Sequence, residues 1–104
     1  MGGILVEYQV LPLGTCSPSV SDLVAAAVNV IRKKGLQFKV TPMATVVKVN
    51  DLKEAGELAQ EIVEEMKKKG VKRIVMVMRA DVRFDKELDM DKKIESVLEK
   101  LETK

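Results

Sequence analysis

Short stretches in which every second residue is apolar alternate along this chain with longer stretches whose apolar residues recur at helical spacing. Their order predicts strand, helix, strand, strand, helix, strand and a final helix. The predicted strands cover residues 3–11, 36–40, 45–49 and 71–82. The predicted helices cover about 17–34, a segment from a cap at Asp51 to a stop at Gly70, and a last segment that carries Met90, Ile94, Val97, Leu98 and Leu101. This order predicts one α+β domain over residues 1–104, with the ferredoxin-like split βαββαβ plan, an antiparallel sheet and an added C-terminal helix.

Right-handed crossovers predict strand order 4-1-3-2, with the first two helices on one face of the sheet. The first strand is central in this order, and its alternation leaves open whether Glu7 faces the helices or the other side. The last strand carries Val75 and Val77 on one side and methionines on the other, so neither side is purely polar. Solvated sheet faces alternate more cleanly than this. We therefore expect the open face to be covered by another copy of the chain in a homo-oligomer.

Composition excludes several function classes. The net charge of +2 and the three aromatic residues do not favour nucleic-acid binding. No apolar run approaches a membrane span, and the start of the chain lacks a signal-peptide layout, so we expect a cytoplasmic protein without a membrane partner. Histidine is absent and Cys16 is the single cysteine, which removes the usual acid–base groups and metal ligands. We expect no metal, no cofactor and no catalysis.

The loop after the first strand is the first candidate site. Thr15, Ser17 and Ser19 follow Gly14, and Ser17-Pro18 has the pattern of a helix cap and first helical residue. Hydroxyls beside free backbone N–H groups could bind an anion or a polar small molecule. Simple capping of the helix explains the same serines without a ligand.

A second group of candidates lies on the strands and on the hairpin turn. Asp81 and Arg83 alternate along the last strand and could share a face as a bidentate pair, or form an ordinary surface ion pair. Glu7 is expected to pair with Lys48 or Arg79. The turn at 41–45 places Met43 at its tip, where it could contact a neighbour or a ligand.

Five short motifs together resemble the small thiamine-binding (YkoF-like) family over nearly the whole chain. They are Pro12-Leu13-Gly14-Thr15 with Ser19-Val20-Ser21, Gly35-Leu36, Thr41-Pro42-Met43-Ala44-Thr45, Gly70-Val71-Lys72-Arg73-Ile74 and Asp81-Val82-Arg83-Phe84-Asp85-Lys86. The resemblance implies a ferredoxin-like fold, assembly into dimers or tetramers, and binding of thiamine or its hydroxymethylpyrimidine part at a subunit boundary without catalysis.

The resemblance also implies which residues bind the ligand. They are Thr15, Ser17, Ser19, Met43, Thr45, Asp81 and Arg83, while Glu7, Asp81 or Tyr8 could face a thiazolium cation. The chain departs from the family pattern at Ala44, where glycine is usual, and at Lys48, where glutamate is usual. A lysine there would repel a cation, and a neutral pyrimidine or an anionic ligand would then be favoured.

Three functions are consistent with these features. The leading hypothesis is a non-catalytic small-molecule binding protein. The second is a regulatory or interaction module whose oligomeric interface is the function. The third is a histidine-free enzyme with Glu7 and Asp81 as acid and base, which requires both carboxylates in one cleft.

Overall fold

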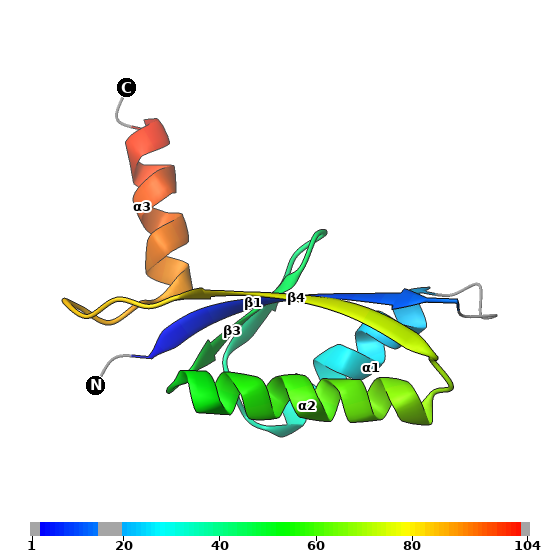
Figure 1. The fold of residues 1–104 in the computed structure, drawn as a ribbon. Coiled ribbons are helices and arrows are strands. Elements are labelled where there is room, and N and C mark those ends of the chain that lie inside the picture. Colours follow the sequence, from blue (N-terminus) through cyan, green and yellow to red (C-terminus); the bar gives the residue numbers. More distant parts are fainter. Residues whose placement is uncertain (1–2, 15–19, 103–104) are drawn as a thin grey trace.

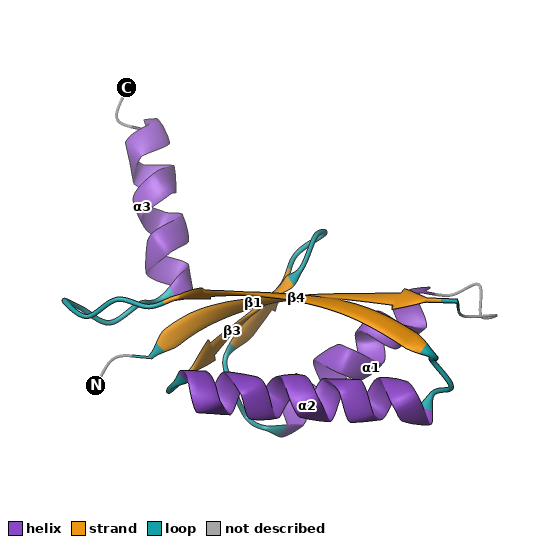
Figure 2. Ribbon diagram, in the orientation of Figure 1, coloured by secondary structure: helices purple, strands orange, loops and turns teal. Residues whose placement is uncertain are grey.

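The computed structural model of the protein describes residues 3–14 and 20–102. Its elements follow the predicted order. They are β1 (Ile4–Leu13), α1 (Val20–Lys33), β2 (Phe38–Val40), β3 (Thr45–Val49), α2 (Leu52–Lys68), β4 (Arg73–Asp81) and α3 (Met90–Glu102). The four strands form one antiparallel sheet with the order β2-β3-β1-β4. Helices α1 and α2 lie on one face and α3 extends away from the other (Figures 1 and 2). The predicted fold class and strand order are confirmed.

The core lies between the sheet and the first two helices. Alternate residues of β1 and β3, among them Val6 and Val47, meet Ile31 of α1 and Ile62 of α2 in one buried cluster. Tyr8 belongs to this cluster, and its hydroxyl donates a 2.7 Å hydrogen bond to the backbone oxygen of Ala55 in α2. The buried polar end of this side chain is therefore satisfied.

Helix α2 begins at the predicted cap. The Asp51 carboxylate accepts from the Glu54 backbone N–H at 2.7 Å, and the Glu54 carboxylate accepts from the Asn50 N–H at 2.8 Å. One orphan donor of the first turn, the Glu54 N–H, is thus paired, and the returning bond reaches Asn50, one residue before the position that the usual capping box pairs. Gly70, with a φ of 87°, follows the helix in a conformation that side chains with a Cβ rarely adopt.

Strand β1 is longer than predicted, because it continues through Pro12 to Leu13. Proline lacks an N–H and is normally confined to strand edges. Beyond Tyr8, which lies opposite Thr45 of β3, β1 pairs with β4 alone. Its end therefore has one unpaired side toward which Pro12 can be directed without loss of a ladder hydrogen bond. Strands β2 and β4 are shorter than predicted.

Helix α3 is fastened to the open face only near its start. Leu88 and Met90 pack on Leu5 in a second, small buried cluster. Four apolar side chains farther along the helix are 48–59% exposed: Ile94, Val97, Leu98 and Leu101. These four residues, which recur at helical spacing, are called the α3 stripe below.

Candidate functional site

A cavity opens where β1 and β3 part. Because the pairing of these strands ends at Tyr8 and Thr45, the β2–β3 turn stands apart from the end of β1, with α1 beneath the gap. The cavity has a volume of about 270 Å³. It is lined mainly by apolar side chains, including Val10, Val24, Ala27, Ile31 and Val40, and none of its described lining residues is charged. A concave, apolar site with few polar groups is typical of small-molecule binding.

Thr41 fixes the turn that forms one wall of this cavity. Its hydroxyl donates to the Ala44 oxygen at 2.8 Å and accepts from the N–H groups of Met43 at 3.3 Å and Ala44 at 3.1 Å. A hydroxyl has one donor and two acceptor sites, so all three are used within the turn. Thr41 therefore shapes the cavity rather than offering a free hydroxyl to a ligand.

Two of the predicted site residues meet in the cavity. Thr45 is 8% exposed, and its hydroxyl makes no hydrogen bond to another described residue. Met43 lines the same cavity yet is 75% exposed, which places it at the mouth. A planar heterocyclic ring could form a hydrogen bond with the Thr45 hydroxyl inside the cavity and contact the flexible Met43 thioether at its mouth.

Tyr8 forms part of the cavity wall next to these residues. Burial, with a smaller effect of the Glu54 carboxylate, raises the pKa of Tyr8 to about 12. The phenol is therefore neutral at physiological pH, and its hydroxyl is engaged with Ala55. The aromatic ring, rather than the hydroxyl, is the part of Tyr8 that a ligand could contact.

Thr15, Ser17 and Ser19 lie outside the described residues, so their predicted role remains a prediction. The segment that contains them joins β1 to α1. Both flanking elements line the cavity, β1 through Leu11 and α1 through Val24.

The charged candidates lie on the other face of the sheet. Glu7 has the opposite orientation to its neighbour Tyr8 in β1, and it pairs with Arg79 of β4 at 3.2 Å. This answers the question of which face Glu7 occupies and selects Arg79 as its partner. Lys48 shares that face and pairs with Glu87 at 2.8 Å, so it does not oppose a cation in the cavity of its own chain.

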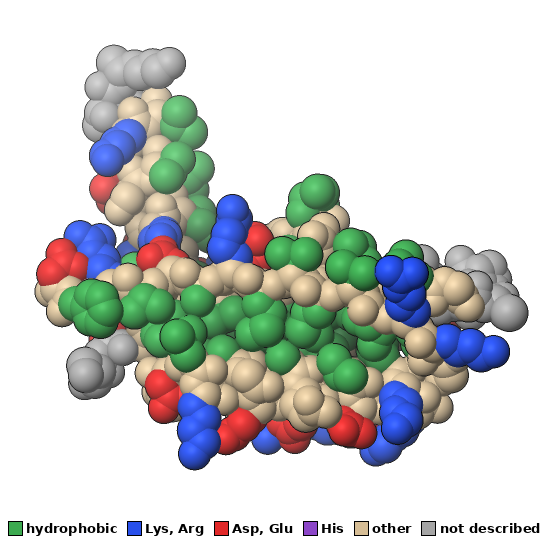
Figure 3. Space-filling view, viewed as in Figure 1, with side chains coloured by type: hydrophobic (Ala, Val, Ile, Leu, Met, Phe, Trp, Pro, Cys, Tyr) green, Lys and Arg blue, Asp and Glu red, His purple; other side chains and the backbone are tan. Residues whose placement is uncertain are grey.

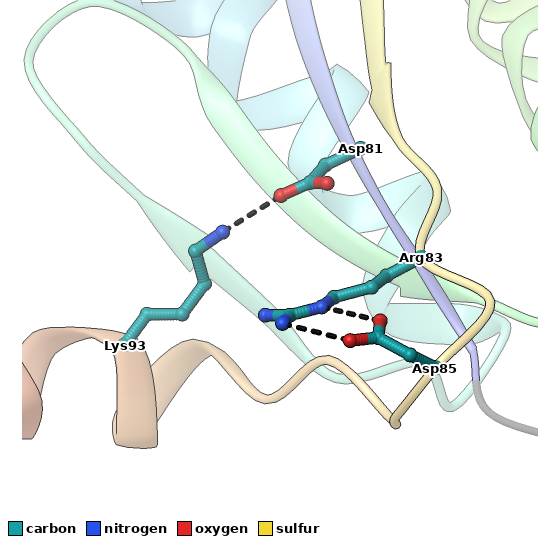
Figure 4. Close-up of polar contacts among 4 residues, drawn as sticks. All are labelled: Asp81, Arg83, Asp85 and Lys93. Carbon is teal, nitrogen blue, oxygen red and sulfur yellow. Dashed lines mark hydrogen bonds and ion pairs between the residues drawn. The ribbon is translucent and has the colours of Figure 1, made fainter.

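The predicted pairing of Asp81 with Arg83 is wrong. The Asp81 carboxylate pairs with Lys93 of α3 at 2.7 Å (Figure 4). Arg83 instead forms a fork with Asp85, in which Nε and Nη2 lie 2.6 Å and 3.0 Å from its two carboxylate oxygens. The prediction fails because β4 ends at Asp81, so strand alternation does not extend to Arg83.

The two carboxylates of the enzyme hypothesis do not share the cavity. Glu7 and Asp81 are each paired with a cation on the open face, at Arg79 and Lys93. Among the described residues, no three histidine, cysteine, aspartate or glutamate side chains are grouped so as to hold a metal ion. Within the same residues, no helix is both long and apolar enough to cross a membrane.

Sequence reasoning missed Thr41 and the α1 side of the cavity. The sequence does contain a signal for Thr41. A threonine at the start of a turn often accepts hydrogen bonds from the backbone N–H groups two and three residues later, which here belong to Met43 and Ala44. Val24 and Ala27 have no comparable signal, because their apolar helical spacing also fits ordinary core packing.

Comparison with known sequences gives one consistent result. The sequence profile of the thiamine-binding protein family matches residues 6–98. A UPF0045 protein of Methanothermobacter thermautotrophicus is 36% identical over 98 residues, which cover 94% of this chain and 99% of that protein. A UPF0045 protein of Staphylococcus xylosus is 35% identical over 97 residues, 89% of this chain and 90% of the relative.

Solved structures show the same fold. A hypothetical protein of Methanocaldococcus jannascii superposes with a TM-score of 0.79 at 30% identity, covering 95% of this chain and 99% of that one. A Thermotoga maritima protein, provisionally assigned to thiamine biosynthesis or salvage, superposes with a TM-score of 0.77. It is 18% identical, with 91% of this chain and 98% of that chain covered, and so supports the fold alone.

Proposed function

Because the chain belongs to the thiamine-binding protein family, we propose that it binds a thiamine-related small molecule and catalyses no reaction on it. The observation that carries this proposal is the uncharged cavity beside the β2–β3 turn, with Met43 at its mouth and the Thr45 hydroxyl inside. Its volume of about 270 Å³ lies just below the usual range for drug-sized ligands. A single heterocyclic ring fits that space better than a whole two-ring molecule.

The proposal assigns the neutral pyrimidine ring to the cavity. A cation enclosed by apolar walls loses its hydration, and without a counter-charge the walls do not compensate for that loss of solvation free energy. The carboxylates of Glu7 and Asp81 cannot supply that counter-charge within one chain, because they face the other side of the sheet. Thr15, Ser17 and Ser19 are proposed to contact the ligand from the first loop, while Glu7, Asp81 and Arg83 are proposed to act at the surface between copies.

Isothermal titration calorimetry with hydroxymethylpyrimidine and with thiamine tests this function. We expect saturable binding of the pyrimidine, weakened about three- to ten-fold by Thr45→Val through the loss of one hydrogen bond. Thr45→Ser, which keeps the hydroxyl, should retain most of the affinity. Glu57→Gln, at an exposed position of α2 that does not line the cavity, is the control and should leave pyrimidine binding unchanged. Absence of heat with both ligands from folded protein would refute the proposed binding function.

A second candidate function is an interaction module, and the exposed α3 stripe favours it. Four neighbouring apolar side chains on one helix face, each about half exposed, are unusual on a monomer surface. Leu11 and Leu13 of β1 are also about 40% exposed on the same side of the sheet. We propose that another copy of the chain covers these surfaces in a homo-oligomer, a dimer or a tetramer.

A further inference from the structure

Beyond Tyr8, the backbone of β1 has an unpaired side that borders the cavity. Strand β3 pairs with β1 only as far as Thr45, opposite Tyr8, whereas β1 continues to Leu13. Figure 1 shows the β2–β3 turn leaving the plane of the sheet beyond this point, and Figure 3 shows hydrophobic side chains at the tip of the turn. The side of β1 that would face β3 therefore borders the cavity at Val10, which is one of the lining residues.

The hydrogen bonds of the sheet show which way the backbone groups of Val10 point. In an antiparallel pair, the N–H and C=O of one residue point to the same side, and those of the next residue point to the other side. The Ala44 oxygen accepts from the Thr41 N–H at 2.9 Å on the β2 side, so the backbone groups of Thr45 point toward β1. Those of Tyr8, opposite Thr45, accordingly point toward β3. Val10 lies two residues farther along β1 and has the same orientation, into the cavity.

Val10 therefore presents one backbone donor and one backbone acceptor to the cavity. Among the described residues, neither group has a hydrogen-bond partner, and Val10 is half-buried. Backbone groups in apolar surroundings are nearly always paired, so a partner from outside the described residues is expected. A strand would need a donor at every second residue of this side, and Pro12, the next residue of the same orientation, has none. A single planar ring needs Val10 alone.

We propose that these two backbone groups bind the ligand. The Val10 N–H donates to a ring nitrogen, and the Val10 oxygen accepts from an amino group on the neighbouring ring carbon. An aminopyrimidine carries this acceptor and this donor side by side in one plane, so it can take the place of an opposite residue in an antiparallel pair. The Thr45 hydroxyl inside the same cavity is available for a third polar contact.

This contact rests on the proposed binding function and adds the atoms that select the ligand. A ring of the same shape without the amino group would leave the Val10 oxygen unpaired among apolar side chains, which weakens binding. The selection comes from the backbone, so it depends on the strand register rather than on the identity of a side chain.

Isothermal titration calorimetry with two ligands tests the selection. One ligand is hydroxymethylpyrimidine, which carries the amino group, and the other is its analogue with a methyl group in that place, of nearly the same size. We expect the wild-type chain to bind the methyl analogue about ten-fold more weakly, because one hydrogen bond is lost and the Val10 oxygen is left unpaired. Equal affinity for the two ligands would overturn the backbone contact.

Amide exchange measured by NMR tests the donor without any substitution. The Gln9 N–H points the other way, toward Val77 of β4, so it is an internal control that is paired with or without ligand. In the free protein, the Val10 amide should exchange faster than the Gln9 amide after correction for intrinsic rates. Saturation with hydroxymethylpyrimidine should slow the Val10 amide about ten-fold and leave the Gln9 amide unchanged.

A proline at position 10 removes the donor. Val10→Pro loses no bond to β4, because the Val10 N–H points away from that strand, as position 12 does where proline already stands. We expect affinity for hydroxymethylpyrimidine to fall about three- to ten-fold. Val10→Ala keeps the N–H and loses only side-chain contacts, so the difference between the two variants measures the hydrogen bond. Circular dichroism shows that each variant is folded.

The outcomes separate this contact from the proposed function. Discrimination against the methyl analogue, together with slower Val10 exchange in the complex, supports the backbone contact. Binding of hydroxymethylpyrimidine without either effect overturns the contact and leaves the binding function standing. Slow Val10 exchange in the free protein would show that the edge is already paired, which also overturns the contact. Absence of binding by the folded wild-type chain overturns both.

Discussion

Tyr8 shows how one side chain serves both the core and the candidate site. Its ring is 2% exposed and lines the cavity, and its hydroxyl reaches the backbone of α2. Burial favours the neutral phenol over the phenolate, which is the physical cause of its raised pKa. The same hydrogen bond ties the Tyr8 side chain, which forms part of the cavity wall, to the backbone of α2.

We predict that Tyr8 titrates with a midpoint near 12 in the folded protein, against 10.0 for an ordinary tyrosine. A pKa raised by folding means that this contribution to stability is complete below pH 10 and is lost as the pH rises through 12. Phenolate absorbance measures the midpoint, with no overlap because Tyr8 is the single tyrosine. A midpoint near 10 in protein still folded would contradict the burial of the hydroxyl.

Thr41 is expected to matter for binding through the turn that it closes. Thr41→Val removes three hydrogen bonds of the hydroxyl at nearly constant volume, and we expect pyrimidine affinity to fall about ten-fold. Amide exchange at Met43 and Ala44 should accelerate in the same variant. Thr41→Ser keeps the hydroxyl and serves as the control. Unchanged exchange in Thr41→Val would show that the turn does not depend on this side chain.

At the scale of elements, the connector 82–89 and the first turn of α3 are held largely by charged contacts at the surface. Lys48 contacts Glu87, Arg83 contacts Asp85, and the Asp89 carboxylate accepts from the Lys92 backbone N–H at 3.0 Å. Hydrogen bonds to the ionised forms lower the pKa of all three carboxyl groups. Only Leu88 and Met90 anchor this segment by burial.

We predict that acidification loosens α3 before it unfolds the domain. The carboxyl pKa values are lowered by folding, so their contribution is present above the ordinary values of 3.8 to 4.5 and is lost as the pH falls through the lowered ones. Amide exchange of Lys92 and Lys93, corrected for intrinsic rates, should therefore rise before that of core residues. Glu87→Gln at neutral pH should reproduce part of this loosening. If the amides of the core and of α3 lost their protection from exchange at the same pH, the helix would not be anchored separately from the core.

At the scale of the whole molecule, one layer of helices leaves the opposite sheet face and most of α3 uncovered (Figure 1). The α3 stripe stands away from its own sheet, so it gains little from packing within one chain. Association would bury these side chains, and the removal of their apolar surface from water would stabilise the assembly.

We predict that Leu98→Asp, in the middle of the α3 stripe, lowers the oligomeric state. A charge at this position opposes burial against another apolar surface. Ser96→Asp, on the polar side of the same helix, is the matched control and should leave the assembly intact. Size-exclusion chromatography with light scattering measures the mass of each variant. An unchanged mass for Leu98→Asp would show that the α3 stripe is not part of an interface.

The sequence by itself determined the order of elements, the sheet topology and the two ends of α2. These depend on local periods and on neighbours within a few residues, such as Asp51 with Glu54 or Gly70 after α2. Local motifs also carried the family resemblance, and the match over residues 6–98 confirms it. Met43 and Thr45 were predicted at the site because they belong to one such motif.

Only the tertiary structure decided which candidates lie together. The face of Glu7 depends on the phase of the whole sheet, because a shift of one residue exchanges its two faces. The partners of Asp81 and Arg83 depend on where β4 ends and where α3 returns. The cavity exists because β1 continues beyond the last residue that pairs with β3. No local sequence pattern indicates this difference in strand length. Contacts between segments distant in sequence therefore divided the predicted site between the two faces of the sheet.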